Sequence, residues 1–130
     1  MIIELISHAC LKYNFKGFSL LTDPWITDDP IKSKVIYKFP PQKKSEKEAL
    51  DGVEYVFVSH THEDHFHLPS IQLISRDVKI LISNFSFAPH QQSRNLVLLD
   101  TLKGQGFTNV QVLRPWEWIR LKHDVDVCLI

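Results

Sequence analysis

Four histidines and two acidic residues crowd into residues 59–67, SHTHEDHFH, directly after the apolar run VEYVFV. In an extended segment, residues two apart point to the same side, so His60 and His62 can present their imidazoles to one point. Asp64 continues this register, but the chain has to turn before the next helix, so Asp64 and His65 can be directed towards a second ion. A short loop of this kind can supply half of the ligands for two adjacent metal ions.

Neutral imidazole and carboxylate suit Zn²⁺, Fe and Mn²⁺, and the absence of nearby thiolate favours a catalytic site over a closed structural one. An open coordination position would hold water, and a zinc-bound water has a pKa near ~7 instead of ~15.7 in bulk. The alternative is a histidine-rich surface loop with incidental spacing. We prefer the catalytic interpretation because the cluster follows the carboxyl end of a predicted strand, where open α/β sheets place their sites.

The segments on either side of the cluster predict a β-loop-α-β unit. Residues 53–59 form a continuous, β-branched apolar run, which is typical of a strand covered on both faces. Residues 68–75 carry apolar side chains at helical spacing, and residues 78–83 resemble a second buried strand. The histidine cluster would therefore lie at the carboxyl end of the first strand.

The rest of the chain predicts further strands, two helices and a long loop. Short apolar runs predict strands at 2–6, 10–15, 18–22, 110–113, 117–121 and 125–130. Helices are expected within 43–50 and over 91–103, and the proline-containing residues 25–42 should form an extended loop. Trp116 and Trp118 share one face of a predicted strand, and we expect them to pack into the core.

Composition limits the kinds of protein that the chain can be. Its 130 residues are 44% hydrophobic and 23% charged, which is typical of one globular domain, 1–130. Fifteen basic residues balance fifteen acidic ones, which argues against a dedicated nucleic-acid or anionic-membrane binder. No segment approaches a membrane span, and the start lacks the features of a signal peptide, so we expect a cytoplasmic protein. Cys10 and Cys128 are too far apart for a C-x-x-C motif and predict neither a disulfide framework nor a thiolate zinc site.

Two motifs carry a resemblance to a known family. His60-Thr61-His62-Glu63-Asp64-His65 resembles the H-x-H-x-D-H signature of the metallo-β-lactamase-fold hydrolases. SHACLKYNFKGFSLLTDPW is similar to the opening of the branch that holds the ascorbate-phosphate lactonases and N-acyl-phosphatidylethanolamine phospholipase D. YVFVSHTHEDHFHLPSIQLI is also similar to part of the hydrolase-like domain of the sialic-acid hydroxylases. The resemblance implies an α/β (α+β) fold, the amino-terminal half of a four-layer αββα sandwich with a mixed sheet and flanking helices.

The resemblance also implies roles for individual residues. His60 and His62 would bind the first metal, and Asp64 and His65 the second, with Asp64 also taking the catalytic role. Asp23 matches the family's early aspartate, which braces the histidine loop from behind, because metal-binding histidines need an acceptor that fixes their tautomer. The alternative for Asp23 is a turn aspartate before proline.

Two further histidines are candidates for the pocket. His8 matches the histidine of the opening motif and either lies near the mouth of the site or has no role. His67 is absent from the signature, and it either lines the substrate pocket or is structural. The implied cofactors are two divalent metal ions, zinc in the first place, with manganese or iron as alternatives.

The function that these motifs imply is that of a metal-dependent hydrolase that uses a metal-bound hydroxide on a small-molecule ester, lactone or phosphoester. One alternative is a non-catalytic half-domain that binds a metal or a partner. Another is part of an oxidative enzyme similar to the sialic-acid hydroxylases. The family's remaining ligands come later in its sequence, so we expect a chain truncated at the carboxyl end. The alternative is a natural short form whose site is completed by another subunit or not at all. We expect the 130-residue form to bind metal poorly and to form a homo-oligomer through the exposed sheet edge.

Overall fold

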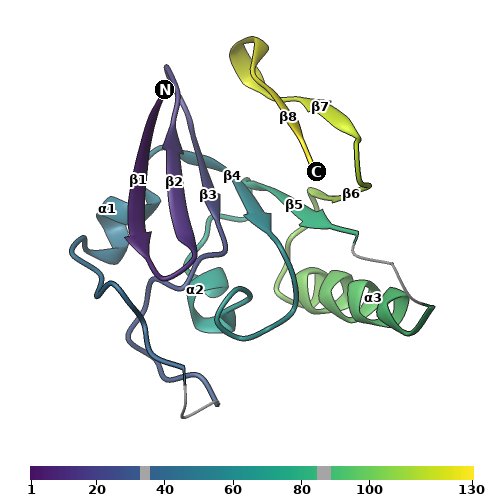
Figure 1. Cartoon of the computed structure of the whole chain (residues 1–130), viewed down its shortest axis with the longest axis horizontal. Helices are drawn as coiled ribbons and strands as arrows, with labels where there is room; N and C mark the ends of the chain where they lie inside the picture. The colour runs from purple at the N-terminus through teal and green to yellow at the C-terminus, as the bar shows by residue number, and fades with distance from the viewer. Residues whose placement is uncertain (33–35, 85–88) are drawn as a thin grey trace.

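The computed structural model describes residues 1–32, 36–84 and 89–130. For residues 89–95 it describes the backbone, and for the others the side chains as well. Within these residues, six strands form one mixed sheet in the order β1-β2-β3-β4-β5-β6 (Figure 1). The strands are β1 (Ile2–Ser7), β2 (Cys10–Asn14), β3 (Ser19–Thr22), β4 (Val53–Val58), β5 (Lys79–Ser83) and β6 (Val110–Leu113). The first three strands form an antiparallel meander, and β3 to β6 pair in parallel.

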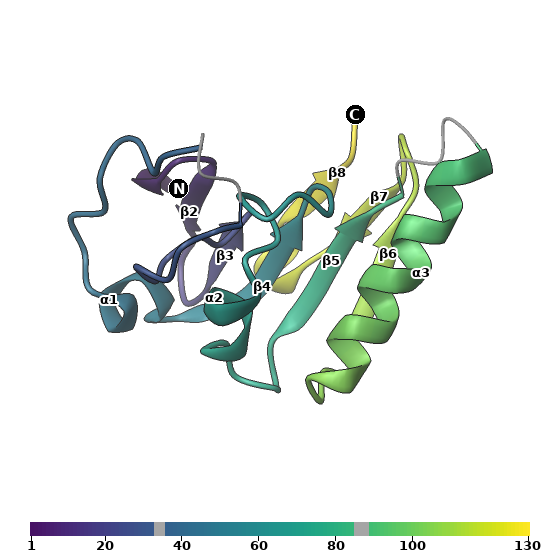
Figure 2. The ribbon, with the colours of Figure 1, turned by 90° about the horizontal axis from the view of Figure 1, so that it is seen from below.

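Helices cover one face of this sheet, and a small hairpin covers part of the other. The helices are α1 (Glu46–Leu50), α2 (Leu68–Gln72) and α3 (Pro89–Gly104). The hairpin pairs β7 (Trp118–Arg120) with β8 (Asp126–Cys128) through a short 3₁₀ turn, Lys122–Asp124. Figure 2 shows α2 and α3 in front of the sheet and β7 and β8 behind it. The described chain therefore has three layers and two apolar cores.

The position of β4 between two apolar cores explains why its sequence is apolar at successive positions. Val56 and Val58 are fully buried in the core on the helix side, whereas Tyr55 and Phe57 belong to the core under the hairpin. A strand covered on both faces has no polar face, so the period of two disappears from its sequence. The same alternation places Leu81 of β5 on the hairpin side and its neighbours on the helix side.

The carboxyl ends of β3 and β4 lie side by side, and this brings two distant segments together. Thr22 pairs with Phe57 in the parallel register, and the amide of Asp23 donates to the carbonyl of Phe57 over 2.8 Å. Asp23 therefore leaves β3 beside the point where Ser59 leaves β4. Crevices at this edge of a parallel sheet are the usual place for a site in α/β folds.

The predicted mixed α/β class is confirmed, and several elements are shorter than predicted. Strand β6 coincides with the predicted 110–113, whereas α2 ends at Gln72 instead of residue 75. Helix α1 begins after Ser45, which caps it through a capping box with Glu48. None of the described helices is long and apolar enough to cross a membrane.

The prediction that Trp116 and Trp118 pack into the core is wrong. Their exposed fractions are 74% and 70%. Ile119 of β7 is buried under the sheet, so its neighbour Trp118 must point away because adjacent residues of a strand face opposite sides. Trp116 precedes β7 with a φ of 64° and is not part of the strand.

Candidate metal centre

The histidine loop turns back on itself immediately after β4. The amides of His65 and Phe66 both donate to the carbonyl of His62, over 3.0 and 2.7 Å. The predicted turn is present, but it begins at His62, so Asp64 does not continue the extended register as the sequence analysis expected. It also folds His65 back over His60 instead of letting the loop run on into α2.

The four predicted ligands form one cluster. His60 Nε2 lies 3.1 Å from His62 Nδ1, and the His60 ring centroid is 4.0 Å from that of His65. His65 Nε2 lies 3.4 Å from Asp64 Oδ2. The two pairs that the sequence assigned to two ions are therefore in direct contact, as adjacent metal positions require.

Asp23 lies behind this loop and holds it at three points. Its carboxylate accepts from the Ser59 amide over 2.7 Å, from the Ser59 hydroxyl over 2.7 Å and from His65 Nδ1 over 2.8 Å. Asp23 has a φ of 40°, an uncommon backbone conformation of the kind that collects at functional sites. Because Nδ1 of His65 donates to Asp23, a neutral His65 has an unprotonated Nε2 that is available to a metal ion.

Ser59 does the same for His60, although the sequence pattern assigned Ser59 no role. Its hydroxyl donates to Asp23 and lies 2.9 Å from His60 Nδ1, so it can accept the Nδ1 hydrogen. His60 then presents a bare Nε2 to the cluster. The available sequence signal was a hydroxyl residue directly before the first histidine at the end of the strand.

His8 joins the cluster from the turn between β1 and β2. Its Nε2 lies 3.1 Å from Asp64 Oδ2, and its ring packs edge-on against Trp25 with centroids 5.5 Å apart. Ligand atoms of His8, Asp64 and His65 all lie within 4.8 Å of one another. His8 therefore lies beside Asp64 and His65.

His67 takes a buried position beneath the loop. It is 3% exposed, its Nδ1 lies 2.8 Å from the Ser70 hydroxyl, and its Nε2 has no hydrogen-bond partner among the described residues. Ser70 in turn accepts from the Ile26 amide over 2.8 Å. His67 therefore connects α2 to the segment after β3, where its ring also packs on Trp25 with centroids 5.8 Å apart.

Local charges favour the protonation states that bind metal. Burial, together with the neighbouring His65 and His62, lowers the pKa of His60, which favours its neutral form. Burial acts to raise the pKa of Asp64, but hydrogen bonds from His8 and its own backbone, with the charge of His65, hold that pKa below its ordinary value. Bare imidazole nitrogens and an ionised carboxylate fit Zn²⁺, Fe or Mn²⁺.

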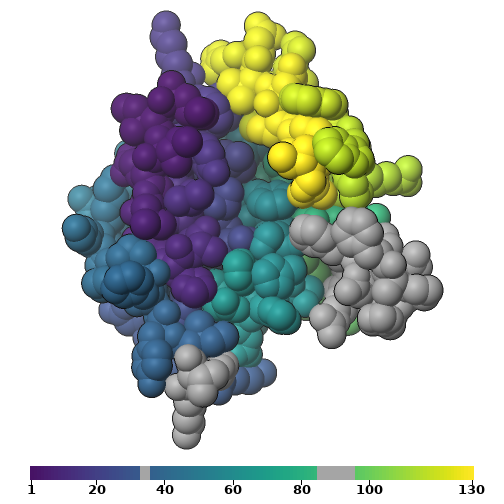
Figure 3. All heavy atoms as spheres, viewed as in Figure 1, coloured from purple at the N-terminus to yellow at the C-terminus, as the bar shows by residue number. Residues whose placement is uncertain are grey.

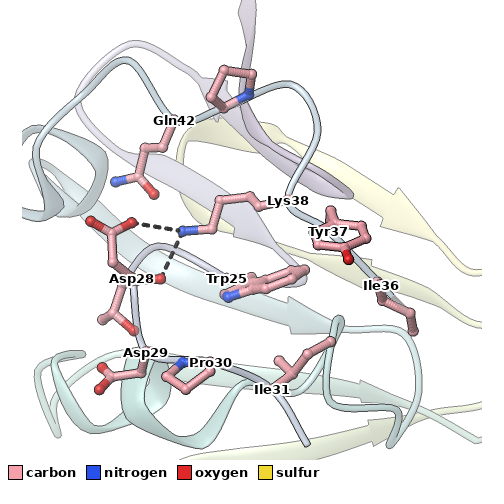
Figure 4. Close-up of a pocket in the computed structure, with 11 residues that line it drawn as sticks. Trp25, Asp28, Asp29, Pro30, Ile31, Ile36, Tyr37, Lys38 and Gln42 are labelled. Atoms are coloured by element: carbon pink, nitrogen blue, oxygen red, sulfur yellow. Dashed lines mark hydrogen bonds and ion pairs between the residues drawn. The ribbon is translucent and has the colours of Figure 1, made fainter. Parts of the chain in front are cut away.

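A cavity of about 520 Å³ lies next to the cluster, within the segment that follows β3 (Figure 4). The indole of Trp25 forms one wall, and Lys38 Nζ lies 5.5 Å above its ring centroid and donates to the Thr27 carbonyl over 2.7 Å. A second hollow, lined by His62, Glu63 and Asp64 among others, shares two wall residues with the first, Ile31 and Ile36. Ile31 and Ile36 therefore separate the cavity from the hollow beside His62 and Asp64.

A family model described as "Beta-lactamase superfamily domain" matches residues 2–128, so the chain belongs to this superfamily. The family resemblance that the two motifs predicted is thus confirmed. Its fold-level expectation, a mixed sheet with flanking helices, is confirmed as well.

Curated relatives match this chain over a small part of their own length. The cytidine monophosphate-N-acetylneuraminic acid hydroxylase of Danio rerio is 29% identical over 119 residues, which cover 89% of this chain and 19% of that protein. The "Putative Rieske 2Fe-2S iron-sulfur protein" of Mycolicibacterium smegmatis is 28% identical over 86 residues, 65% of this chain and 16% of the relative. The chain therefore spans less than a fifth of the length of these proteins.

Solved structures share the fold at low sequence identity. A possible metal-dependent hydrolase from Veillonella parvula DSM 2008 matches with a TM-score of 0.62 and 21% identity, over 88% of this chain and 42% of that one. An isothiocyanate hydrolase from Delia radicum gut bacteria matches with a TM-score of 0.63 and 21% identity, over 92% and 43%. A diiron β-hydroxylase from Streptomyces venezuelae has a TM-score of 0.56 and 20% identity, over 91% and 21%.

Proposed function

We propose that this chain carries metal ligands of a metal-dependent hydrolase that acts on an ester, lactone or phosphoester. The observation that carries the proposal is the braced cluster: His60 and His65 turn bare Nε2 atoms towards His62 and Asp64 because Ser59 and Asp23 occupy their Nδ1 atoms. The two hydrolases among the structural neighbours support this choice of reaction.

His60 and His62 would hold one divalent ion, and Asp64 and His65 a second, with zinc, manganese or iron as the candidates. A bound divalent ion lowers the pKa of water and polarises a substrate oxygen. The chain's own contribution is to keep the ligands in place: Asp23 fixes the loop against the end of β3, and the ionised Asp64 adds the negative charge that balances the ion.

The cavity beside Trp25 is the proposed recess for a small-molecule substrate. Trp25 Nε1 and Gln42 Oε1 are buried and have no hydrogen-bond partner among the described residues, and both residues line the cavity. Figure 4 shows the indole below Lys38, with its nitrogen end turned towards Asp28 and Asp29. A buried donor or acceptor without a partner costs free energy, so a small molecule that reaches these two atoms with an acceptor for the indole N–H and a donor for the amide oxygen would gain affinity.

Hydrolysis assays on the full gene product that contains this chain test the proposal. We expect turnover of a p-nitrophenyl ester, a lactone or a phosphodiester that depends on added Zn²⁺ or Mn²⁺ and falls by at least about 100-fold in Asp64→Asn. His123→Asn is the matched control, because His123 stacks on Phe18 away from the cluster. Metal-loaded protein that hydrolyses none of the three substrate classes would exclude the proposal.

The second candidate is a part of an oxidative enzyme. The hydroxylase and iron–sulfur relatives favour it, because their matches cover most of this chain. This candidate predicts that iron, and not zinc, supports activity, and that oxygen is consumed together with substrate. Equal activity with zinc under anaerobic conditions would rule it out.

A further inference from the structure

We propose that His8 is a third protein ligand for the ion held by Asp64 and His65, so that residues of this chain alone form a complete three-ligand site. This inference rests on the metal site of the proposed function and adds a ligand to it. It differs from the arrangement expected from sequence, in which each ion receives only two ligands from this chain.

The spacing of the three ligand atoms fits one ion. Ligand atoms around a tetrahedral zinc lie roughly 3.3 Å apart, given bond lengths of about 2.0–2.1 Å. His8 Nε2 lies 3.1 Å and His65 Nε2 lies 3.4 Å from Asp64 Oδ2, and the remaining pair lies within 4.8 Å. Two edges of the coordination triangle therefore have the required length, and along the third, which is at most 4.8 Å long, the two imidazole nitrogens would draw together on an ion.

The contact between His65 and Asp64 needs a cation. Because Nδ1 of His65 donates to Asp23, the lone pair of a neutral His65 at Nε2 faces a carboxylate oxygen over 3.4 Å. Two acceptors at this separation repel one another unless a proton or a metal ion lies between them. A metal ion can satisfy this pair and His8 at once, whereas a single proton can satisfy only one contact.

The backbone holds His8 in place for this role. His8 has a φ of 46° in the turn that joins β1 to β2, next to a register shift between Leu5 and Ser7. The Ser7 hydroxyl donates to the Trp25 carbonyl over 2.6 Å, and the Trp25 ring packs against His8. The imidazole is thus positioned before an ion arrives, which reduces the entropy lost on binding.

The three side chains are also accessible to an ion. Their exposed fractions are 25% for His8, 13% for Asp64 and 21% for His65. The site is open enough for entry from solvent and retains a free position for water, as catalytic zinc sites do. The chain should therefore bind one ion tightly at this triad, and a second ion more weakly at His60 and His62.

Cobalt titration of the metal-free chain tests the inference, because the visible absorption of Co²⁺ reports its coordination. We expect one tightly bound Co²⁺ per chain with the strong absorption of a four-coordinate ion. In His8→Asn the affinity should fall at least about tenfold and the absorption should change, since asparagine tolerates the positive φ but lacks the imidazole. His8→Gly, which also tolerates this φ, should behave in the same way.

Two controls separate the failure of this inference from that of the proposed function. His123→Asn also replaces a histidine at positive φ and should leave Co²⁺ binding unchanged. If Asp64→Asn loses Co²⁺ while both His8 variants keep the wild-type affinity and spectrum, His8 is not a ligand and the proposed function stands. If the wild-type chain binds neither Co²⁺ nor Zn²⁺, the three-ligand site fails, whereas metal-dependent hydrolysis by the full gene product would still support the proposed function.

Discussion

His65 donates its Nδ1 hydrogen to Asp23 across 2.8 Å, and this contact joins the end of β3 to the histidine loop after β4. The same carboxylate accepts from the amide and the hydroxyl of Ser59. One aspartate thus positions the first residue of the loop and fixes the tautomer of a histidine six residues later. The conformation of the histidine loop therefore depends on Asp23, an aspartate that lies outside the loop.

Asp23→Asn should be less damaging than Asp64→Asn. Asparagine keeps the shape of Asp23 and removes only the charge behind His65, for which a loss of about 10–100-fold in metal affinity or activity is typical. Asp64→Asn removes a negatively charged ligand, so the ion it holds should be lost and hydrolysis should fall by several orders of magnitude. Elemental analysis of the metal content and turnover measurements on both variants show which substitution causes the larger loss. Equal losses of the same ion would contradict the assignment of Asp23 as a brace.

Ser59→Ala should weaken metal binding at His60 by about tenfold. Alanine leaves His60 Nδ1 without its 2.9 Å partner, so the ring can turn and present either nitrogen. The matched control is Ser75→Ala, because the Ser75 hydroxyl accepts a long hydrogen bond of 3.4 Å from the nearby Asp77 amide in an exposed turn. Competition with a chromophoric chelator measures both affinities. Indistinguishable values for the two variants would show that Ser59 has no part in orienting His60.

The histidine loop was predictable because its residues are close in sequence. His60 to His65 fall within six positions at the end of an apolar strand, so the spacing alone predicts that their side chains lie close together. Asp23 could be identified only through the opening motif of the family, since its contact with the loop depends on the parallel pairing of β3 with β4.

Other features required the three-dimensional fold. His8 meets Asp64 across 56 residues of sequence, through a turn at positive φ that no periodicity reveals. Trp116 and Trp118 were misplaced because alternation tells which residues share a face but not which face is covered. The side chain that the sheet covers is Ile119, and only the packing of the hairpin determines this.

The two cysteines should differ in reactivity. Burial raises the pKa of the Cys10 thiol to about 12, and its side chain is fully buried, whereas Cys128 is half-buried. Iodoacetamide reacts with thiolate, so at pH 8 it should label Cys128 first and leave Cys10 unmodified in the folded protein. Intact-mass spectrometry should find one adduct without denaturant and two in concentrated urea. Rapid double labelling of the folded protein would contradict the buried position of Cys10.

The burial of Cys10 also predicts a pH dependence of stability. The folded protein keeps the thiol proton at pH values where the unfolded chain, with a pKa near 9.0, has lost it. The stabilising contribution is therefore complete below about pH 9 and is lost as the pH rises towards 12. Urea unfolding of the wild type and of Cys10→Ala at pH 8 and 10 measures the effect. The wild type should lose more unfolding free energy over this interval than the variant, and equal losses would refute the prediction.

The exposed strand β1 should mediate association between copies of the chain. It is the outermost strand of the six-stranded sheet, and Ile3 and Leu5 are 53% and 54% exposed. Figure 3 shows the amino-terminal residues, in purple, on the surface along one flank of the molecule. Unpaired backbone groups together with apolar side chains favour pairing with another strand, and a second copy of β1 supplies both.

Leu5→Lys should therefore weaken self-association by about tenfold or more, because the ammonium group would lose its water at the paired edge. Leu73→Lys is the matched control: Leu73 is a similarly exposed leucine, at 45%, and it lies at the end of α2 on the helix side of the sheet. Sedimentation velocity over a range of concentrations measures the association of all three proteins. We expect the wild type and Leu73→Lys to associate alike and Leu5→Lys to remain monomeric at concentrations where they pair. A wild-type chain that stays monomeric throughout, or equal weakening by both lysines, would show that β1 is not the contact.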